Sequence, residues 1–110
     1  MSTHRTQRIN EEVLRAMAEI LPTVNDPRVS GMISVLRVDV TSDLKYAKIY
    51  LSTLEKQDKK EVLKGLNSSK GYIRHELGQR VKLRQLPELN FILDDSIAEG
   101  NRILDIMGQL

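Results

Sequence analysis

The sequence predicts an α+β fold in which helices pack against one face of a small sheet. Two observations support this prediction. In some segments apolar residues recur every three or four positions, which is the spacing of an amphipathic helix. In others they alternate with polar residues, which is the spacing of a half-buried strand. The predicted order of elements is helix, strand, strand, helix, helix, strand and a final helix.

The first helix is predicted from the spacing of Ile9, Val13 and Met17, with charged residues on the other faces. Pro22 lacks a backbone donor and disfavours a helical conformation in the residue before it. The helix is therefore expected to end near Leu21.

An antiparallel hairpin is predicted next. Residues 33–40 and 46–52 alternate between apolar and polar side chains, and Thr41, Ser42 and Asp43 supply turn-forming residues between them. The residues expected to face the core are Leu36, Val38 and Val40 in the first strand and Ala47, Ile49 and Leu51 in the second.

Two consecutive helices are predicted after the hairpin. Asp58 followed by Glu61 resembles a capping arrangement that opens the second helix, which is expected to break between Ser68 and Gly71. The third helix carries an apolar stripe formed by Ile73, Leu77 and Val81.

A third strand and a fourth helix complete the prediction. Residues 89–93 again alternate, and Ser96 with Glu99 supplies a capping box for the final helix. The two-helix crossover is long enough to return the third strand parallel to the second. We therefore expect a two-layer domain whose helices cover one sheet face.

Composition excludes several classes of function. The 110 residues are expected to form one domain, 1–110, and no apolar run approaches the roughly 20 residues that a membrane helix needs. Cysteine is absent, and two histidines, His4 and His75, leave little for a metal or nucleophilic site. Asp94 and Asp95 have no histidine or metal set beside them to support catalysis. We expect a cytoplasmic, non-enzymatic protein without a cofactor.

The basic segment from Lys70 to Arg84 is the strongest indication of function. It contains five basic residues and one acidic residue, a formal charge of +4, whereas the whole chain carries +2. The positive charge is therefore local, which indicates a polyanionic partner, most simply nucleic acid. A solvated helix face is the alternative interpretation of the same residues.

Several separated motifs give the sequence a resemblance to a known family. The element order resembles that of a type II KH domain, a nucleic-acid-binding fold. Across nearly its whole length the chain is similar to the ribosome-binding factor A family of bacterial small-subunit assembly factors. The motifs that carry this resemblance are RINEEV at 8–13, DPR at 26–28, VDVTSDL at 38–44, YAKIY at 46–50, GYIRHELG at 71–78 and LRQLPELNF at 83–91.

The resemblance implies where RNA binds. In that family a tight alanine-x-glycine kink replaces the usual KH glycine loop, and the corresponding residues here are Ser69, Lys70 and Gly71. Gly71 is expected to serve the kink itself, since glycine takes a positive φ without a Cβ penalty. The residues expected to contact RNA are Lys70, Arg74, Arg80, Arg84, Lys82, Arg28, Arg5 and Arg8, among which Arg84 is expected to be the most structural.

The resemblance also implies a partner, the small (30S) ribosomal subunit with its 16S rRNA. It further implies a role in late maturation, including 5′-end processing of the rRNA, and in growth in the cold. The protein is expected to be a monomer off the ribosome. Two alternatives stay open: a generic KH-like module that binds single-stranded RNA through Tyr46 and Tyr50, and a protein-interaction domain that uses the first and last helices.

Overall fold

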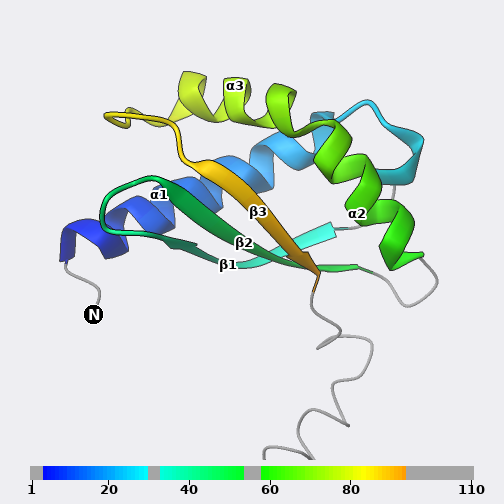
Figure 1. Ribbon diagram of the computed structural model, residues 1–110, viewed down its shortest axis with the longest axis horizontal. Coiled ribbons are helices and arrows are strands. Elements are labelled where there is room, and N and C mark those ends of the chain that lie inside the picture. The colour runs from blue at the N-terminus through cyan, green and yellow to red at the C-terminus, as the bar shows by residue number, and fades with distance from the viewer. Residues whose placement is uncertain (1–3, 30–32, 54–57, 94–110) are drawn as a thin grey trace, which may run out of the picture.

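The computed structural model describes residues 4–29, 33–53 and 58–93, which follow the predicted order from the first helix to the third strand (Figure 1). The final helix predicted from Ser96 onward lies outside the described residues. Two short 3-10 helices, Leu21–Thr23 and Pro27–Val29, connect the first helix to the sheet. The helices are α1 (His4–Ile20), α2 (Lys59–Ser68) and α3 (Lys70–Arg80), and the strands are β1 (Ile33–Val40), β2 (Tyr46–Thr53) and β3 (Glu88–Leu93).

The helix ends follow the local sequence. α1 passes into the 3-10 helix at Leu21, next to Pro22, as expected from the missing backbone donor of proline. At the start of α2 the Asp58 carboxylate accepts hydrogen bonds from the backbone N–H groups of Lys60 at 3.0 Å and Glu61 at 3.4 Å. The predicted cap is therefore present.

The sheet has the strand order β1-β2-β3, with β2 in the centre. β1 and β2 form the predicted antiparallel hairpin. β3 pairs with β2 in parallel, in a register that runs from Tyr46 beside Glu88 to Leu51 beside Leu93. The parallel pairing predicted from the long crossover is confirmed.

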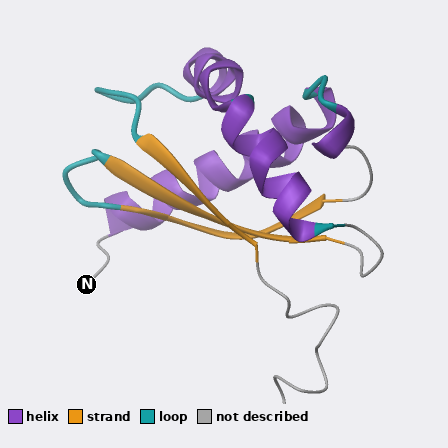
Figure 2. Cartoon of the chain, turned by 45° about the vertical axis from the view of Figure 1, so that its right-hand side comes forward, coloured by secondary structure: helices purple, strands orange, loops and turns teal. Residues whose placement is uncertain are grey.

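The described helices all lie on one side of the sheet, where the core forms (Figure 2). α1 packs on β1, and α2 and α3 pack on β3. The outward-facing strand residues Asp39, Lys48 and Asn90 stay exposed on the other side. Residues buried in the core include Val13, Met17 and Ile20 of α1, Ala47, Ile49 and Leu51 of β2, Leu66 of α2, Ile73 and Leu77 of α3, and Leu89 of β3.

A bulge in β1 corrects one part of the predicted core. Val35 pairs with Leu51 and Arg37 with Tyr50, so Leu36 is an extra residue in the ladder. The extra residue breaks the alternation, and Leu36, expected to face the core, is 37% exposed. Val35 on one side of the bulge and Val38 on the other both pack into the core.

Candidate nucleic-acid interface

The junction between α2 and α3 is a single residue, Ser69, with φ −96° and ψ 7°. The Ser69 N–H donates to the carbonyl oxygens of Gly65 at 3.0 Å and Leu66 at 3.1 Å, so the residue at the bend stays bonded to the last turn of α2. Gly71 is already the second residue of α3 and does not have a positive φ, and a Cβ built on it meets no atom within 4 Å. The expectation that Gly71 supplies the kink is therefore wrong, because the non-helical conformation falls on Ser69.

Arg28 lies beside this junction, but its guanidinium already forms hydrogen bonds within the protein. Its guanidinium donates from Nη2 to Asp26 Oδ2 at 2.9 Å and to Ser68 Oγ at 3.2 Å, and from Nε to Asp26 Oδ1 at 3.1 Å. These bonds hold the pKa of the Asp26 carboxyl below its usual value and raise the pKa of Arg28. Arg28 therefore joins the segment before β1 to the end of α2.

Arg74 has a structural role. Its Nε donates to the Pro87 carbonyl oxygen at 3.0 Å and its Nη2 to the Leu86 carbonyl oxygen at 2.9 Å. The side chain thus uses its planar fork on two consecutive backbone carbonyls. The side chain fixes α3 to the segment that enters β3. Its Nε and Nη2 donors are therefore not available to bind two oxygens of a phosphate.

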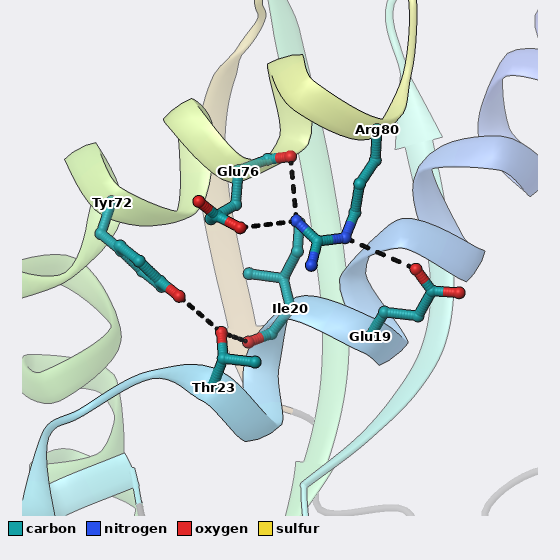
Figure 3. Close-up of polar contacts among 6 residues, drawn as sticks. All are labelled: Glu19, Ile20, Thr23, Tyr72, Glu76 and Arg80. Carbon is teal, nitrogen blue, oxygen red and sulfur yellow. Dashed lines mark hydrogen bonds and ion pairs between the residues drawn. The ribbon is translucent and has the colours of Figure 1, made fainter.

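Arg80 braces α3 against α1 (Figure 3). Its Nη1 donates to Glu76 Oε1 at 2.7 Å, and its Nε lies 3.5 Å from Glu19 Oε1 on α1. The hydrogen bond to Glu76 is the largest cause that raises the pKa of Arg80. Arg80 is paired with two carboxylates rather than presented alone to solvent.

A hydroxyl pair anchors the other end of α3 (Figure 3). The Thr23 Oγ1 donates to the Ile20 carbonyl oxygen at 2.6 Å and lies 2.7 Å from the Tyr72 hydroxyl oxygen. Because the single Thr23 proton goes to Ile20, the Tyr72 hydroxyl is the donor to Thr23. The orientation of α3 is therefore fixed at both ends.

The remaining predicted cations that the structure describes are at least partly accessible to solvent. Within the described part of the chain, no ion pair involves Lys70, Lys82, Arg84 or Arg8. Lys82, Arg84 and Arg8 are exposed and Lys70 is half-buried. The side chain of Arg5 lies outside the described residues.

Arg8 lies on α1, and the three solvent-facing cations of the basic segment lie in two places. Lys70 begins α3 beside the Ser69 junction, whereas Lys82 and Arg84 follow the other end of this helix, which is about 16 Å long. Arg84, predicted to be the most structural of the group, has no ion pair among the described residues. Arg74 and Arg80 have the structural contacts instead, because the carbonyls and carboxylates that receive them come from other parts of the fold.

The tyrosine face of the sheet is partly occupied by its own side chains. The Arg37 guanidinium carbon lies 4.1 Å from the centre of the Tyr50 ring, a cation–π contact. Tyr46 on the same face is 54% exposed. Acidic Asp39 and Glu88 also face outward, so the face carries charges of both signs.

A cavity of about 410 Å³ was not predicted from the sequence. It lies among the first turns of α1, the β1–β2 turn and the segment before β3, and its lining includes Arg84 and Asp43. Leu44 in its wall has φ 62°, a left-handed conformation that favours glycine. A hydropathy pattern does not reveal a positive φ at leucine. The sequence signal for this part of the fold was therefore limited to the turn-forming residues 41–43.

Among the described residues there is neither a metal-binding cluster nor a membrane-spanning helix. Residues 4–29, 33–53 and 58–93 contain no cluster of three or more His, Cys, Asp or Glu side chains that would hold a metal ion. No helix among them has the length and hydropathy to cross a membrane.

Comparison with known proteins gives a consistent family assignment. The family model described as Ribosome-binding factor A matches residues 5–107. The ribosome-binding factor A of Clostridium novyi is 46% identical over 112 aligned positions, which cover 100% of this chain and 93% of the relative.

Solved structures share the fold. The crystal structure of ribosome-binding factor A from Thermus thermophilus superposes with a TM-score of 0.73 at 24% identity, covering 80% of this chain and 94% of that one. A homology model of the Thermus thermophilus factor, fitted into a cryo-electron microscopy map of a 30S complex of that factor, superposes with a TM-score of 0.64 at 20% identity, covering 86% and 97%.

Proposed function

The chain belongs to the ribosome-binding factor A family, and on that premise we propose that it binds the small ribosomal subunit through its 16S rRNA. It assists the late maturation of that subunit, including 5′-end processing of the rRNA, and supports growth in the cold. The family is one of non-enzymatic assembly factors. The protein acts in the cytoplasm as a single KH-like domain and is a monomer away from the ribosome.

The observation that carries this proposal is the set of solvent-facing cations at the two ends of α3. Lys70, Lys82 and Arg84 have no acidic partner within the described residues. Cations without an internal partner are the ones that can neutralise phosphates and release counterions. The 30S complex of the Thermus thermophilus factor supports the choice of the small subunit as partner.

The mode of action follows from binding alone. A protein that contacts phosphates at two separated places favours the rRNA arrangement that presents phosphates at that spacing. Arg74 and Arg80 contribute indirectly, because they hold α3 and thereby fix the spacing between Lys70 and Arg84. No bond is made or broken by the protein in this mechanism.

Co-sedimentation with purified small subunits, large subunits and assembled ribosomes tests the proposal. The wild-type protein should sediment selectively with small subunits. The triple variant Lys70→Gln, Lys82→Gln, Arg84→Gln should bind at least tenfold more weakly, and the salt slope of binding should fall by about 1 for each phosphate that the variant no longer neutralises. The matched control is Arg15→Gln, Lys48→Gln, Lys60→Gln, which removes the same charge from exposed positions elsewhere.

Two outcomes contradict the proposal. Equal sedimentation with all three particles would mean nonspecific binding by a basic protein. Equally weakened binding in the triple variant and its control would mean that net charge, rather than the ends of α3, determines binding. Substitution of Arg74 or Arg80 is not suitable for this test, since removal of their internal hydrogen bonds perturbs the position of α3.

The protein-interaction alternative has less support from the fold. It requires the apolar stripe of α1 to be available to a partner helix. Val13, Met17 and Ile20 of this stripe are fully buried against the sheet and α3. A partner helix would have to displace the protein's own core to reach them.

A further inference from the structure

The cavity beside Arg84 is held together by hydrogen bonds between three chain segments. The Val40 N–H donates to Asn10 Oδ1 at 2.8 Å, which ties the end of β1 to α1. The Gln85 Nε2 donates to the Asp43 carbonyl oxygen at 3.0 Å, which ties the segment before β3 to the β1–β2 turn. These two hydrogen bonds therefore hold the walls of the cavity in fixed positions relative to one another.

The β1–β2 turn is fixed in a costly conformation. Leu44 keeps its positive φ because its N–H donates to the Thr41 carbonyl oxygen at 2.9 Å. The Asp43 Oδ1 accepts from Thr41 Oγ1 at 2.7 Å and from the Lys45 N–H at 3.1 Å. A non-glycine residue in this region persists only where its surroundings over-determine it, and such residues concentrate at ligand sites. The turn thereby places Ser42, Asp43 and Leu44 along one wall of the cavity.

The lining has the groups that a ribonucleotide needs. Arg84 supplies a guanidinium without an ion-pair partner in the described residues, and Thr6 and Ser42 supply hydroxyl groups. Ile9 and Leu44 supply apolar surface. Asp43 supplies a carboxylate, and within the described residues its hydrogen bonds use Oδ1. The volume of about 410 Å³ is within the range of roughly 300–1,000 Å³ typical of small-molecule sites.

We propose that this cavity holds one unstacked ribonucleotide of the bound RNA, with its phosphate at Arg84 and its sugar and base against Ile9 and Leu44. Asp43 accepts a hydrogen bond from a neutral donor of that nucleotide, the 2′-hydroxyl or a base amino group. Single-stranded RNA is commonly read in this way, by splaying out a base and contacting its edges and its 2′-hydroxyl. The inference rests on the proposed function, since the nucleotide in the cavity would belong to the rRNA that the protein binds.

A nuclear magnetic resonance titration of the whole ¹⁵N-labelled protein with the four nucleoside 5′-monophosphates tests the inference. Amide shifts should concentrate at the cavity residues and saturate. One nucleotide should bind more tightly than its deoxy counterpart if Asp43 accepts from the 2′-hydroxyl, or more tightly than the other three if Asp43 accepts from a base amino group. Arg84→Gln should weaken that binding about tenfold or more, as expected for removal of a charge-assisted hydrogen bond. Arg15→Gln makes the same chemical change at an exposed site outside the cavity and should leave it unchanged.

Inorganic phosphate is the third probe. If phosphate alone produces the same shifts as the nucleotides, or if the shifts spread over all exposed cations, the inference is overturned. It is also overturned if Arg84→Gln and Arg15→Gln have equal effects.

A photo-crosslinker at Ser42 separates this inference from the proposed function. With p-benzoylphenylalanine at Ser42 and purified small subunits, the crosslink should fall on the rRNA. A crosslink to a ribosomal protein, with subunit binding intact, overturns the nucleotide site and leaves the proposed function standing. A protein that does not sediment with small subunits at all refutes the proposed function first.

Discussion

Gly65 on α2 lies so close to Val29 that a Cβ at position 65 would stand 2.7 Å from Val29 Cγ2. The same added Cβ on Gly65 would stand 3.0 Å from the Cβ of Arg28. The missing side chain lets the 3-10 helix Pro27–Val29 pack directly on α2, one turn before the Ser69 junction. The close approach of these two segments therefore depends on a glycine in the middle of a helix.

Gly65→Ala should destabilise the protein by about 1 kcal/mol. Alanine gains up to about 1 kcal/mol in helix propensity, but overpacking a buried contact typically costs about 1–3 kcal/mol. Gly71→Ala is the control, because its new Cβ meets open space and should be neutral or stabilising. Urea denaturation measures both, and a Gly65→Ala protein as stable as Gly71→Ala would mean that Val29 gives way without cost.

Arg74→Gln should lower the free energy of unfolding by about 2 kcal/mol. The substitution removes the donors that satisfy the Leu86 and Pro87 carbonyls, and hydrogen bonds from charged groups contribute about 1.5–3 kcal/mol. Arg15→Gln, an exposed change on α1, should alter stability by less than about 0.5 kcal/mol. Equal unfolding midpoints for the two variants would contradict the structural role of Arg74.

The Asp26–Arg28 pair should make stability depend on acid pH. The pKa of Asp26 is held below its ordinary value of 3.8, chiefly by the Arg28 side chain. Its contribution is therefore fully present above pH 3.8 and is lost as pH falls through the lowered folded-state pKa. Urea midpoints measured from neutral pH down to acid should fall less steeply in Asp26→Asn and in Arg28→Gln than in the wild type. An unchanged slope in both variants would show that the pair does not form in solution.

Tyr46→Ala with Tyr50→Ala should leave binding to small subunits within about twofold of wild type. The Arg37 guanidinium already covers one side of the Tyr50 ring, and the surrounding face carries both signs of charge. The same co-sedimentation assay is used, with Lys70→Gln, Lys82→Gln, Arg84→Gln as the positive comparison. Weaker binding by the tyrosine variant than by the charge variant would favour the generic single-stranded RNA module.

The secondary structure could be predicted because local periodicity determines it. The alternation that predicted β2 places Ala47, Ile49 and Leu51 in the core, and all three are fully buried. The bulge at Leu36 could not be predicted in the same way, because one inserted residue changes the pairing without changing the hydropathy of the segment.

The candidate interface was less accessible to sequence reasoning. A basic segment shows where arginines are concentrated, but the partner of each arginine is set by tertiary structure. Arg74 finds backbone carbonyls 12 and 13 residues away, and Arg80 finds Glu19 on a different helix. The local charge therefore indicated a region and could not rank its members.

The parallel pairing of β2 with β3 imposes an order on folding. The β1–β2 hairpin can form from neighbouring residues, but β3 joins only after the chain has passed through α2 and α3. Until then Ile49 in the central strand lacks its lateral neighbour Phe91, and the second edge of β2 has unpaired backbone groups. Closure of this long loop is the entropically expensive event, so the last described strand is expected to set the folding rate. Residues 88–93 are thus expected to be the last part of the described sheet to form.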